Sequence, residues 1–274
     1  MIRALVLSFC LIAPMAHAQN SGLIRLTDRD DLFGYEAVGR LDMAGKGTCT
    51  GALIAADLVL TAAHCVTQRG TGTMDPAKVT FRAGYRDGDA IAEAKGTRIA
   101  VHDRYDPDAP STVYNALYDM ALLQLDKPIH VGLADPFVVA DPTVNSRDIS
   151  IVSYGRGRNE ALSWQRKCRM RGKFDGLIAF NCDVTFGSSG APVFEKIGHR
   201  VKIVSLVSRG GLDENGDVLA FGMELPRAVS EMKQQLRSGR GVTEAASAQP
   251  TRVMPRRLGL PQSDAGSSAR FVKP

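Results

Sequence analysis

The sequence lacks the features that define several classes of protein. It contains no fixed-period repeat, which argues against solenoids and propellers. Neither a CxxC nor an HxxxH spacing occurs, so we expect no zinc site. No other metal and no cofactor are expected either. Aromatic residues are few, at 6%, whereas 44% hydrophobic and 23% charged residues are ordinary for a globular protein and exclude a fibrous or largely disordered chain.

The first residues have the pattern of a secretory signal peptide. A basic start at Arg3 precedes an apolar run over residues 4–13 and the small-x-small ending at residues 16–18. We predict cleavage after Ala18, so that the mature chain begins at Gln19. No later apolar run is long enough to cross a membrane, so we expect no transmembrane segment and a secreted or periplasmic protein.

Removal of the signal peptide also removes Cys10 and leaves four cysteines, which allow three pairings. We favour Cys49–Cys65 and Cys168–Cys182, because each pair lies within one short segment that can fold back on itself as adjacent strands.

Hydrophobic patterning between residues 31 and 225 predicts an all-β fold. Many short β-prone runs are separated by turn residues, which favours a closed barrel or sandwich over parallel βαβ units. The runs are 34–41, 50–54, 58–61, 79–83, 97–102, 121–125, 149–154, 167–174, 177–181, 192–194, 202–208 and 218–224. One long helix is expected at about 227–236, after Pro226.

The chain divides into four parts. Residues 1–18 are the signal peptide, 19–30 a short leader, 31–238 the folded domain and 239–274 a basic tail. The tail is rich in Gly, Ser, Ala, Pro and Arg, so it is expected to be disordered, with an electrostatic tether to an acidic surface or nucleic acid as the functional alternative.

Three separate motifs supply the residues of a hydrolytic site. They are His64 in TAAHC, Asp119 in YDMALL and a pair of serines in GSSG at 187–190. Serine can act as a nucleophile, histidine as the base that takes its proton, and aspartate as the acid that orients the base.

These motifs resemble those of trypsin-like serine peptidases with the chymotrypsin fold, particularly the bacterial secreted branch that includes glutamyl endopeptidases. TAAHC (61–65), YDMALLQL (118–125) and GSSGAPV (187–193) carry the resemblance, which extends over residues 31–236. It implies two antiparallel six-stranded β-barrels with a C-terminal helix. The order His, Asp, Ser is the one used in that fold.

The resemblance also implies a role for each motif residue. The pattern Gly-x-Ser-Gly-x-Pro makes Ser189 the nucleophile, with His64 as its base and Asp119 as the orienting acid. The N–H groups of Gly187 and Ser189 would form the oxyanion hole. Cys49 and Cys65 match the disulfide that brackets the histidine.

Ser188 departs from the trypsin pattern. Animal trypsins have an aspartate there, which pairs with a new amino terminus after zymogen cleavage, and serine has no charge for that role. We therefore expect no activation by the trypsin route.

The substrate pocket is less clearly defined. Asp183 lies six residues before Ser189, where trypsins have the acid that binds Arg or Lys, and Gly210 and Gly222 would line the pocket. Cleavage after Arg or Lys is therefore the favoured prediction. Glutamate preference stays open, although the strand at 202–208 lacks the histidine that such enzymes use, and Arg209 could complement an acidic group.

The sequence thus predicts a serine endopeptidase that acts as a monomer on protein or peptide substrates, with no nucleic-acid partner. The alternative is a catalytically silent binding protein on the same fold. The Asp-rich segments 103–108 and 213–217 are interpreted as solvated turns rather than calcium sites.

Overall fold

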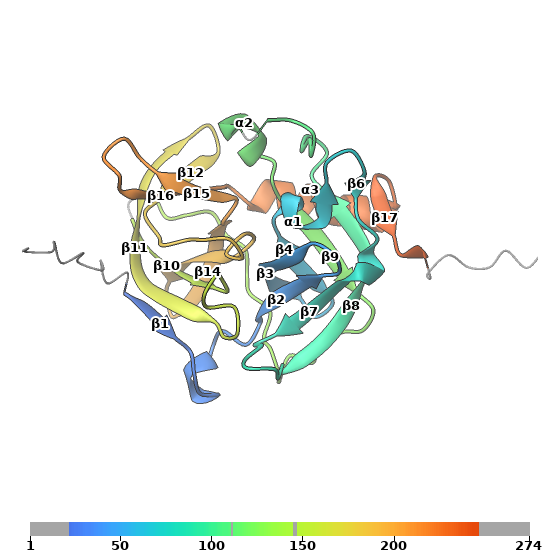
Figure 1. Cartoon of the computed structure of the whole chain (residues 1–274), viewed down its shortest axis with the longest axis horizontal. Helices are drawn as coiled ribbons and strands as arrows, with labels where there is room; N and C mark the ends of the chain where they lie inside the picture. Colours follow the sequence, from blue (N-terminus) through green and yellow to red (C-terminus); the bar gives the residue numbers. More distant parts are fainter. Residues whose placement is uncertain (1–21, 111, 145–146, 247–274) are drawn as a thin grey trace, which may run out of the picture.

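Two β-structures lie side by side in the computed structural model, which describes residues 22–110, 112–144 and 147–246 (Figure 1). The first is a closed barrel in the order β8-β7-β2-β3-β4-β9, with β9 paired back to β8. Its strands are β2 (Val38–Met43), β3 (Gly47–Ala55), β4 (Leu58–Thr61), β7 (Val79–Ala83), β8 (Ala92–Val101) and β9 (Ala121–Leu125).

The alternation of apolar and polar residues explains why these segments form a barrel. In β7, Val79, Phe81 and Ala83 are buried, whereas Thr80 and Arg82 between them are half-buried. Successive side chains of a strand point to opposite faces, so one face of β7 fills the barrel interior. All six of these strands overlap runs predicted from the sequence.

The second β-structure is an open sheet in the order β14-β13-β10-β11-β12-β16-β15. Its strands are β10 (Asp148–Ser153), β11 (Ser163–Phe174), β12 (Leu177–Phe180), β13 (Pro192–Ile197), β14 (Arg200–Leu206), β15 (Arg209–Leu212) and β16 (Val218–Met223). The chymotrypsin-like all-β fold is confirmed, with one closed barrel and one half-barrel sheet instead of two closed barrels.

Local contacts bring the end of β14 against β16 without a strand ladder. The Ser208 N–H donates to the Phe221 carbonyl at 2.9 Å, and the Ser205 hydroxyl donates to the Met223 carbonyl at 2.9 Å. A Cβ at Gly222 would lie 2.0 Å from the Leu206 carbonyl oxygen, so the two strands approach too closely there for any side chain.

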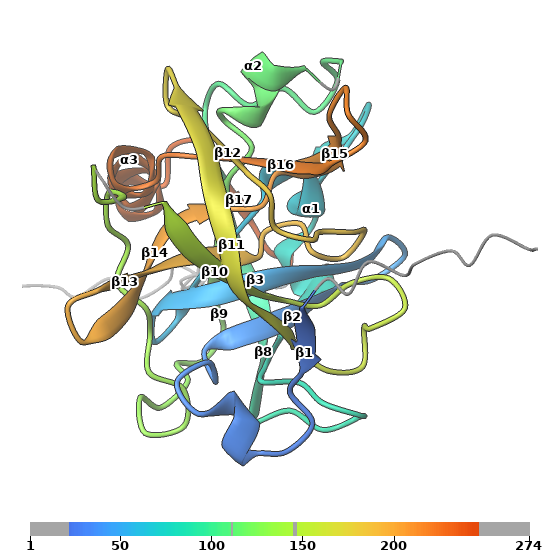
Figure 2. The ribbon, with the colours of Figure 1, turned by 90° about the vertical axis from the view of Figure 1, so that its left-hand side faces the viewer.

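Helices are few and short. The predicted C-terminal helix is α3 (Pro226–Ser238), which buries Val229, Met232 and Leu236 and packs outside the sheets against β8 and β9; Figure 2 shows it end-on. The remaining short elements are α1 (Ala63–Val66), α2 (Val113–Ala116), the 3-10 turns η1 (Asp30–Leu32) and η2 (Pro76–Lys78), and the two-residue strands β5 (Thr67–Gln68) and β6 (Gly72–Thr73). None of the helices in the described ranges has the length and apolar character needed to span a bilayer.

The folded domain extends beyond both predicted boundaries. Within the predicted leader, β1 (Leu23–Arg25) pairs with β11, and Leu26 is buried. Within the predicted tail, β17 (Val242–Glu244) pairs with β8, and Ala245 is buried. Burial of apolar side chains holds both segments on the domain. The predicted signal peptide and residues 247–274 of the predicted tail lie outside the described residues.

Both predicted disulfides are present. Cys49–Cys65 joins β3 to α1 with a Cα–Cα distance of 6.2 Å, and Cys168–Cys182 joins β11 to the segment after β12 with 5.1 Å.

Candidate active site

Strand pairing brings His64 next to Asp119. β4 and β9 are antiparallel with Thr61 opposite Ala121. His64 follows Thr61 by three residues and Asp119 precedes Ala121 by two, so both leave the same end of this strand pair. His64 lies in the single turn of α1, which Cys65 anchors to β3 through the disulfide.

Two hydrogen bonds join these residues. The His64 backbone N–H donates to Asp119 Oδ1 at 2.8 Å, and His64 Nδ1 lies 2.7 Å from Asp119 Oδ2. The Asp119 side chain is 3% exposed, whereas that of His64 is 38% exposed. The His64 side chain is therefore accessible to solvent and the Asp119 carboxylate is not.

The carboxylate of Asp119 stays ionised despite its burial. Burial alone would raise its pKa, but attraction to His64 and hydrogen bonds from His64 and Ser208 hold the pKa below its ordinary value. The Ser208 hydroxyl donates to Asp119 Oδ2 at 2.6 Å. Ser208 follows β14, so the half-barrel sheet helps to hold an acid that belongs to the closed barrel.

Ser189 lies in the turn before β13, and this turn is fixed to the closed barrel. The Thr50 N–H donates to the Ser189 carbonyl at 2.9 Å, and the Thr50 hydroxyl donates to the Gly187 carbonyl at 2.8 Å. A Cβ at Gly190 would lie 2.2 Å from Thr61 Oγ1, so glycine is required for the turn to approach β4 this closely.

Ser189, Gly187 and His64 line one cavity of about 410 Å³ between the two β-structures. The nucleophile candidate and the base candidate therefore face the same space from opposite sheets. No hydrogen bond joins their side chains among the described residues. Such contacts in substrate-free sites often form only when substrate binds.

The peptide group between Phe186 and Gly187 has a defined direction. The Phe186 carbonyl accepts from the Arg156 N–H at 2.7 Å. In a trans peptide the N–H points opposite to the carbonyl, so the Gly187 N–H points away from Arg156. Gly187 has φ +97°, which glycine adopts without steric cost.

Ser188, the residue before Ser189, is buried, and its hydroxyl both donates and accepts a hydrogen bond. Its hydroxyl donates to the Tyr154 carbonyl at 2.9 Å and accepts from Arg158 Nη2 at 3.1 Å. Arg158 Nη1 also donates to the Ser153 carbonyl at 2.8 Å. Burial lowers the pKa of Arg158, and attraction to Asp183 opposes this shift. The residue before Ser189 is thus held by a cation from within the chain.

The three predicted pocket residues have different surroundings. Asp183 is half-buried, and its N–H donates to Gln165 Oε1 at 2.7 Å. Gly210 lies against Val184, whose Cγ2 would be 2.3 Å from a Cβ at position 210. Gly222 lies at the contact between β14 and β16, which gives its glycine a structural role independent of any pocket.

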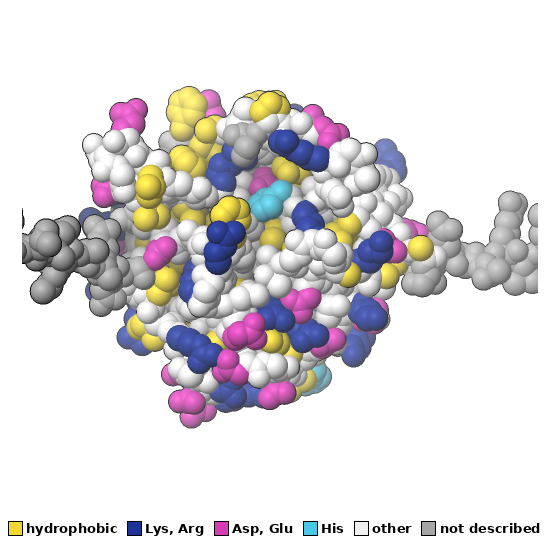
Figure 3. All heavy atoms as spheres, in the orientation of Figure 1, with side chains coloured by type: hydrophobic (Ala, Val, Ile, Leu, Met, Phe, Trp, Pro, Cys, Tyr) yellow, Lys and Arg dark blue, Asp and Glu magenta, His cyan; other side chains and the backbone are white. Residues whose placement is uncertain are grey.

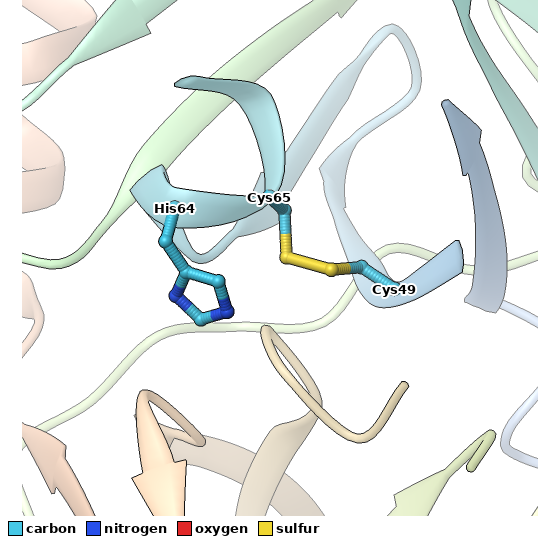
Figure 4. Close-up of side chains that lie close together, drawn as sticks. All are labelled: Cys49, His64 and Cys65. Carbon is cyan, nitrogen blue, oxygen red and sulfur yellow. A yellow bond between two sulfur atoms is a disulfide. The ribbon is translucent and has the colours of Figure 1, made fainter. Parts of the chain in front are cut away.

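One cluster of described residues has the residue types of a metal site. Side-chain atoms of Cys49, His64 and Cys65 lie within 4.8 Å of one another (Figure 4). The two sulfurs are bonded to each other and offer no thiolate, so the cluster lacks the donors that zinc uses.

Sequence reasoning did not find Ser208, Arg158 or Thr50. Each is one serine, arginine or threonine among many. Ser208 and Thr50 reach the site across the interface between the two β-structures, and Arg158 reaches it from a separate loop of the half-barrel side. The position of Ser208 at the end of the strand predicted over 202–208 was the only available signal.

Comparisons with known proteins agree with this architecture. Residues 34–218 match the family model described as Trypsin. Over 93 residues, 34% of this chain, the sequence is 39% identical to Serine protease 56 of Homo sapiens, and the match spans only 14% of that protein.

Two solved structures share the fold. A Glu endopeptidase in complex with MPD superposes with a TM-score of 0.63 at 20% identity, over 79% of this chain and 97% of that one. A thermostable serine protease from an extremophilic microorganism superposes with a TM-score of 0.59 at 17% identity, over 74% and 97% of the two chains. Since the family model covers more than half of the sequence, this chain belongs to the trypsin family.

Proposed function

We propose that the protein is an exported, monomeric serine endopeptidase that hydrolyses peptide bonds with Ser189, His64 and Asp119. The observation that carries the proposal is the 2.7 Å contact between His64 Nδ1 and Asp119 Oδ2, with Ser189 in the same cavity as His64. Membership of the trypsin family supports it, as do the serine proteases among the relatives and structural neighbours.

The proton positions follow from this contact. Asp119 accepts the Nδ1 proton of His64, which leaves Nε2 free to accept the proton of the Ser189 hydroxyl. The serine oxygen attacks the substrate carbonyl, and the amine leaves with the proton held by His64. Water then attacks the acyl-enzyme with His64 again as base, which releases the acid and restores Ser189.

The oxyanion formed during each step needs donors in a fixed position. The N–H groups of Gly187 and Ser189 would supply them. The direction of the Gly187 N–H, away from Arg156, supports this role.

An extended peptide has a place to bind beside the site. β15 is the edge strand of the half-barrel sheet, paired on one side with β16. A substrate could add to its other edge as a further strand. Export is supported by the signal-peptide pattern and by the two disulfides, which persist in oxidising compartments.

Cleavage after Arg or Lys remains a prediction that depends on Asp183. Arg158 attracts the same carboxylate and partly compensates its charge, which reduces the attraction left for a basic substrate side chain. Cleavage of a mixed peptide library, with products identified by mass spectrometry, measures this specificity directly.

The proposal is tested by labelling with a fluorophosphonate and by cleavage of the same library. The wild-type protein should be labelled at one serine, and Ser189→Ala should lose labelling and at least about 10⁴-fold of its peptidase activity while remaining folded. Labelling of the Ser188→Ala variant at Ser189 would show that Ser189, and not Ser188, is the reactive serine. Failure of the wild-type protein to label or cleave would favour the catalytically silent binding protein.

A further inference from the structure

Two cavities flank the exposed face of His64. The first, of about 390 Å³, includes Thr67, Tyr105 and Ser208 and is named here the Tyr105 cavity. The second is the 410 Å³ cavity that includes Ser189 and Phe186, named here the Phe186 cavity. A peptide with its scissile bond at Ser189 would place residues on one side of that bond in the Tyr105 cavity and residues on the other side in the Phe186 cavity.

The walls of both cavities are cationic. Arg69 and Arg209 line the Tyr105 cavity, Arg156 lines the Phe186 cavity, and Lys46 lines both. Figure 3 shows Lys and Arg side chains gathered around the hollow that holds a histidine. Among the described residues, Asp119 supplies the single carboxylate that lines either cavity, and this carboxylate is buried and hydrogen-bonded to His64 and Ser208.

These four cations have no carboxylate partner in the part of the chain that the structure describes. Within the described ranges, none of them forms an ion pair. Lys46 Nζ donates to the carbonyls of His64, Cys65 and Thr67, so its charge is fixed beside α1. The nearby acids Asp106 and Asp108 are exposed; Asp106 accepts from the Asp108 N–H in its own loop, and Asp108 accepts from the Gly70 N–H of a neighbouring loop.

Arg209 carries the clearest sign of a missing partner. Its Nε is buried and has no hydrogen-bond partner among the described residues, although a buried donor without an acceptor is costly. On the other side, the Arg156 guanidinium lies 4.2 Å from the ring centroid of exposed Phe186. One cation on each side of Ser189 is therefore available to a substrate carboxylate.

We propose that this cleft selects protein segments with Asp or Glu within about two residues of the scissile bond, on either side of it, through Arg209 in the Tyr105 cavity and Arg156 in the Phe186 cavity. The inference rests on the proposed peptidase function and concerns the flanking residues, not the side chain near Asp183. Residues of an extended peptide are about 3.3 Å apart, so the neighbours of the scissile bond are the ones within reach of these cavities. Complementary charge at a water-accessible site changes selectivity and association rate more than affinity.

The test uses one peptide that the enzyme cleaves, made with Gln, Glu or Lys at a flanking position before or after the scissile bond. We expect kcat/KM to be about 3- to 10-fold higher for Glu than for Gln at each position, and lower for Lys. Raising NaCl from about 0.05 M to about 0.5 M should shrink these ratios, because salt screens exposed charges.

Matched variants show which arginine causes the charge preference on each side of the scissile bond. Arg209→Gln should abolish the Glu/Gln ratio on one side of the scissile bond and Arg156→Gln on the other, whereas Arg209→Lys should keep it. Arg209→Glu should invert the preference towards Lys. Arg237→Gln, on the exposed face of α3, removes a positive charge outside both cavities and should leave every ratio unchanged.

Equal kcat/KM for Glu and Gln peptides, in a protein that fluorophosphonate labels at Ser189, would overturn the inference and leave the proposed function intact. Absence of labelling would instead overturn the proposed function. The Kd values of the same peptides for the Ser189→Ala variant measure the charge preference without turnover. Equal Kd values for the Glu and Gln peptides in that variant would also overturn the inference.

Discussion

Single residues at the site are held in place by hydrogen bonds from side chains that are distant in sequence. The Asp119 carboxylate accepts a hydrogen bond from the Ser208 hydroxyl, and the Ser188 hydroxyl accepts one from the Arg158 guanidinium. Each of these bonds crosses from one part of the chain to another that is distant in sequence. The geometry around Ser189 and Asp119 therefore depends on polar side chains from other segments of the chain.

Replacing Arg158 should affect both stability and turnover. Arg158→Met leaves the Ser153 carbonyl and the Ser188 hydroxyl without their donor, so we expect a loss of about 1–3 kcal/mol in the free energy of unfolding. We also expect at least about a 10-fold fall in kcat with a smaller change in KM, because interactions lost only in the transition state act on kcat. Urea unfolding and steady-state kinetics measure the two effects.

Two further variants serve as controls for this residue. Arg158→Lys keeps the charge and should recover part of kcat, whereas Arg171→Met removes an exposed arginine of β11 and should change neither quantity. An Arg158→Met protein that is destabilised but has wild-type kcat would show that Arg158 stabilises the fold without positioning Ser189.

At the scale of strands, the two sheets that carry these residues close on themselves in different ways. The first barrel closes by a regular ladder between β8 and β9. The half-barrel sheet instead approaches closure through Ser205 and Ser208, at a point where Gly222 leaves no room for a side chain. Since Ser208 also binds Asp119, this closure is linked to the site.

Adding one methyl group at Gly222, where β14 and β16 meet, should lower the stability of the fold. Gly222→Ala would place Cβ 2.0 Å from the Leu206 carbonyl oxygen, so β14 and β16 must separate. Overpacking of this kind costs about 1–3 kcal/mol and occasionally more. Thermal unfolding should show a clearly lower Tm than for Gly172→Ala in β11, where no atom lies within 4 Å of the added Cβ. Equal Tm values for the two variants would contradict this account.

The whole molecule should become less stable as pH falls, in two steps. Burial holds the pKa of His102 below its ordinary value of 6.5, with Asp103 and Glu231 opposing the shift and Arg104 reinforcing it. The pKa of Asp119 is held below 3.8. In both cases the unfolded chain takes up protons before the native state. The free energy of unfolding therefore decreases as pH falls below 6.5 towards the native pKa of His102, and again below 3.8.

Urea unfolding between about pH 8 and pH 3 measures this dependence. His102→Gln should reduce the decrease in the first step, and Asp119→Asn should reduce it in the second. His130→Gln, which replaces an exposed histidine, is the control and should leave the His102 contribution in place. The same slope for wild-type and His102→Gln proteins would mean that His102 makes no contribution.

Much of this protein could be predicted from the sequence because the relevant signals are local. The alternation in segments such as Val79–Ala83 predicted the strands, Pro226 predicted the start of α3, and short separations predicted Cys49–Cys65 and Cys168–Cys182. The TAAHC, YDMALLQL and GSSGAPV motifs predicted the family. β1, β15 and β17 were missed because strands of three or four residues, mostly exposed or half-buried, show too little alternation.

The remaining features depended on the tertiary structure, because each is a contact between segments far apart in sequence. The pairing of β4 with β9 decided that His64 meets Asp119, and Thr50 decided where the Ser189 turn lies. The link from Arg158 to Ser188 could not be read from either residue alone. The same is true of the cationic walls around His64, since Arg209 and Arg156 become neighbours of one cleft only when the two β-structures pack against each other.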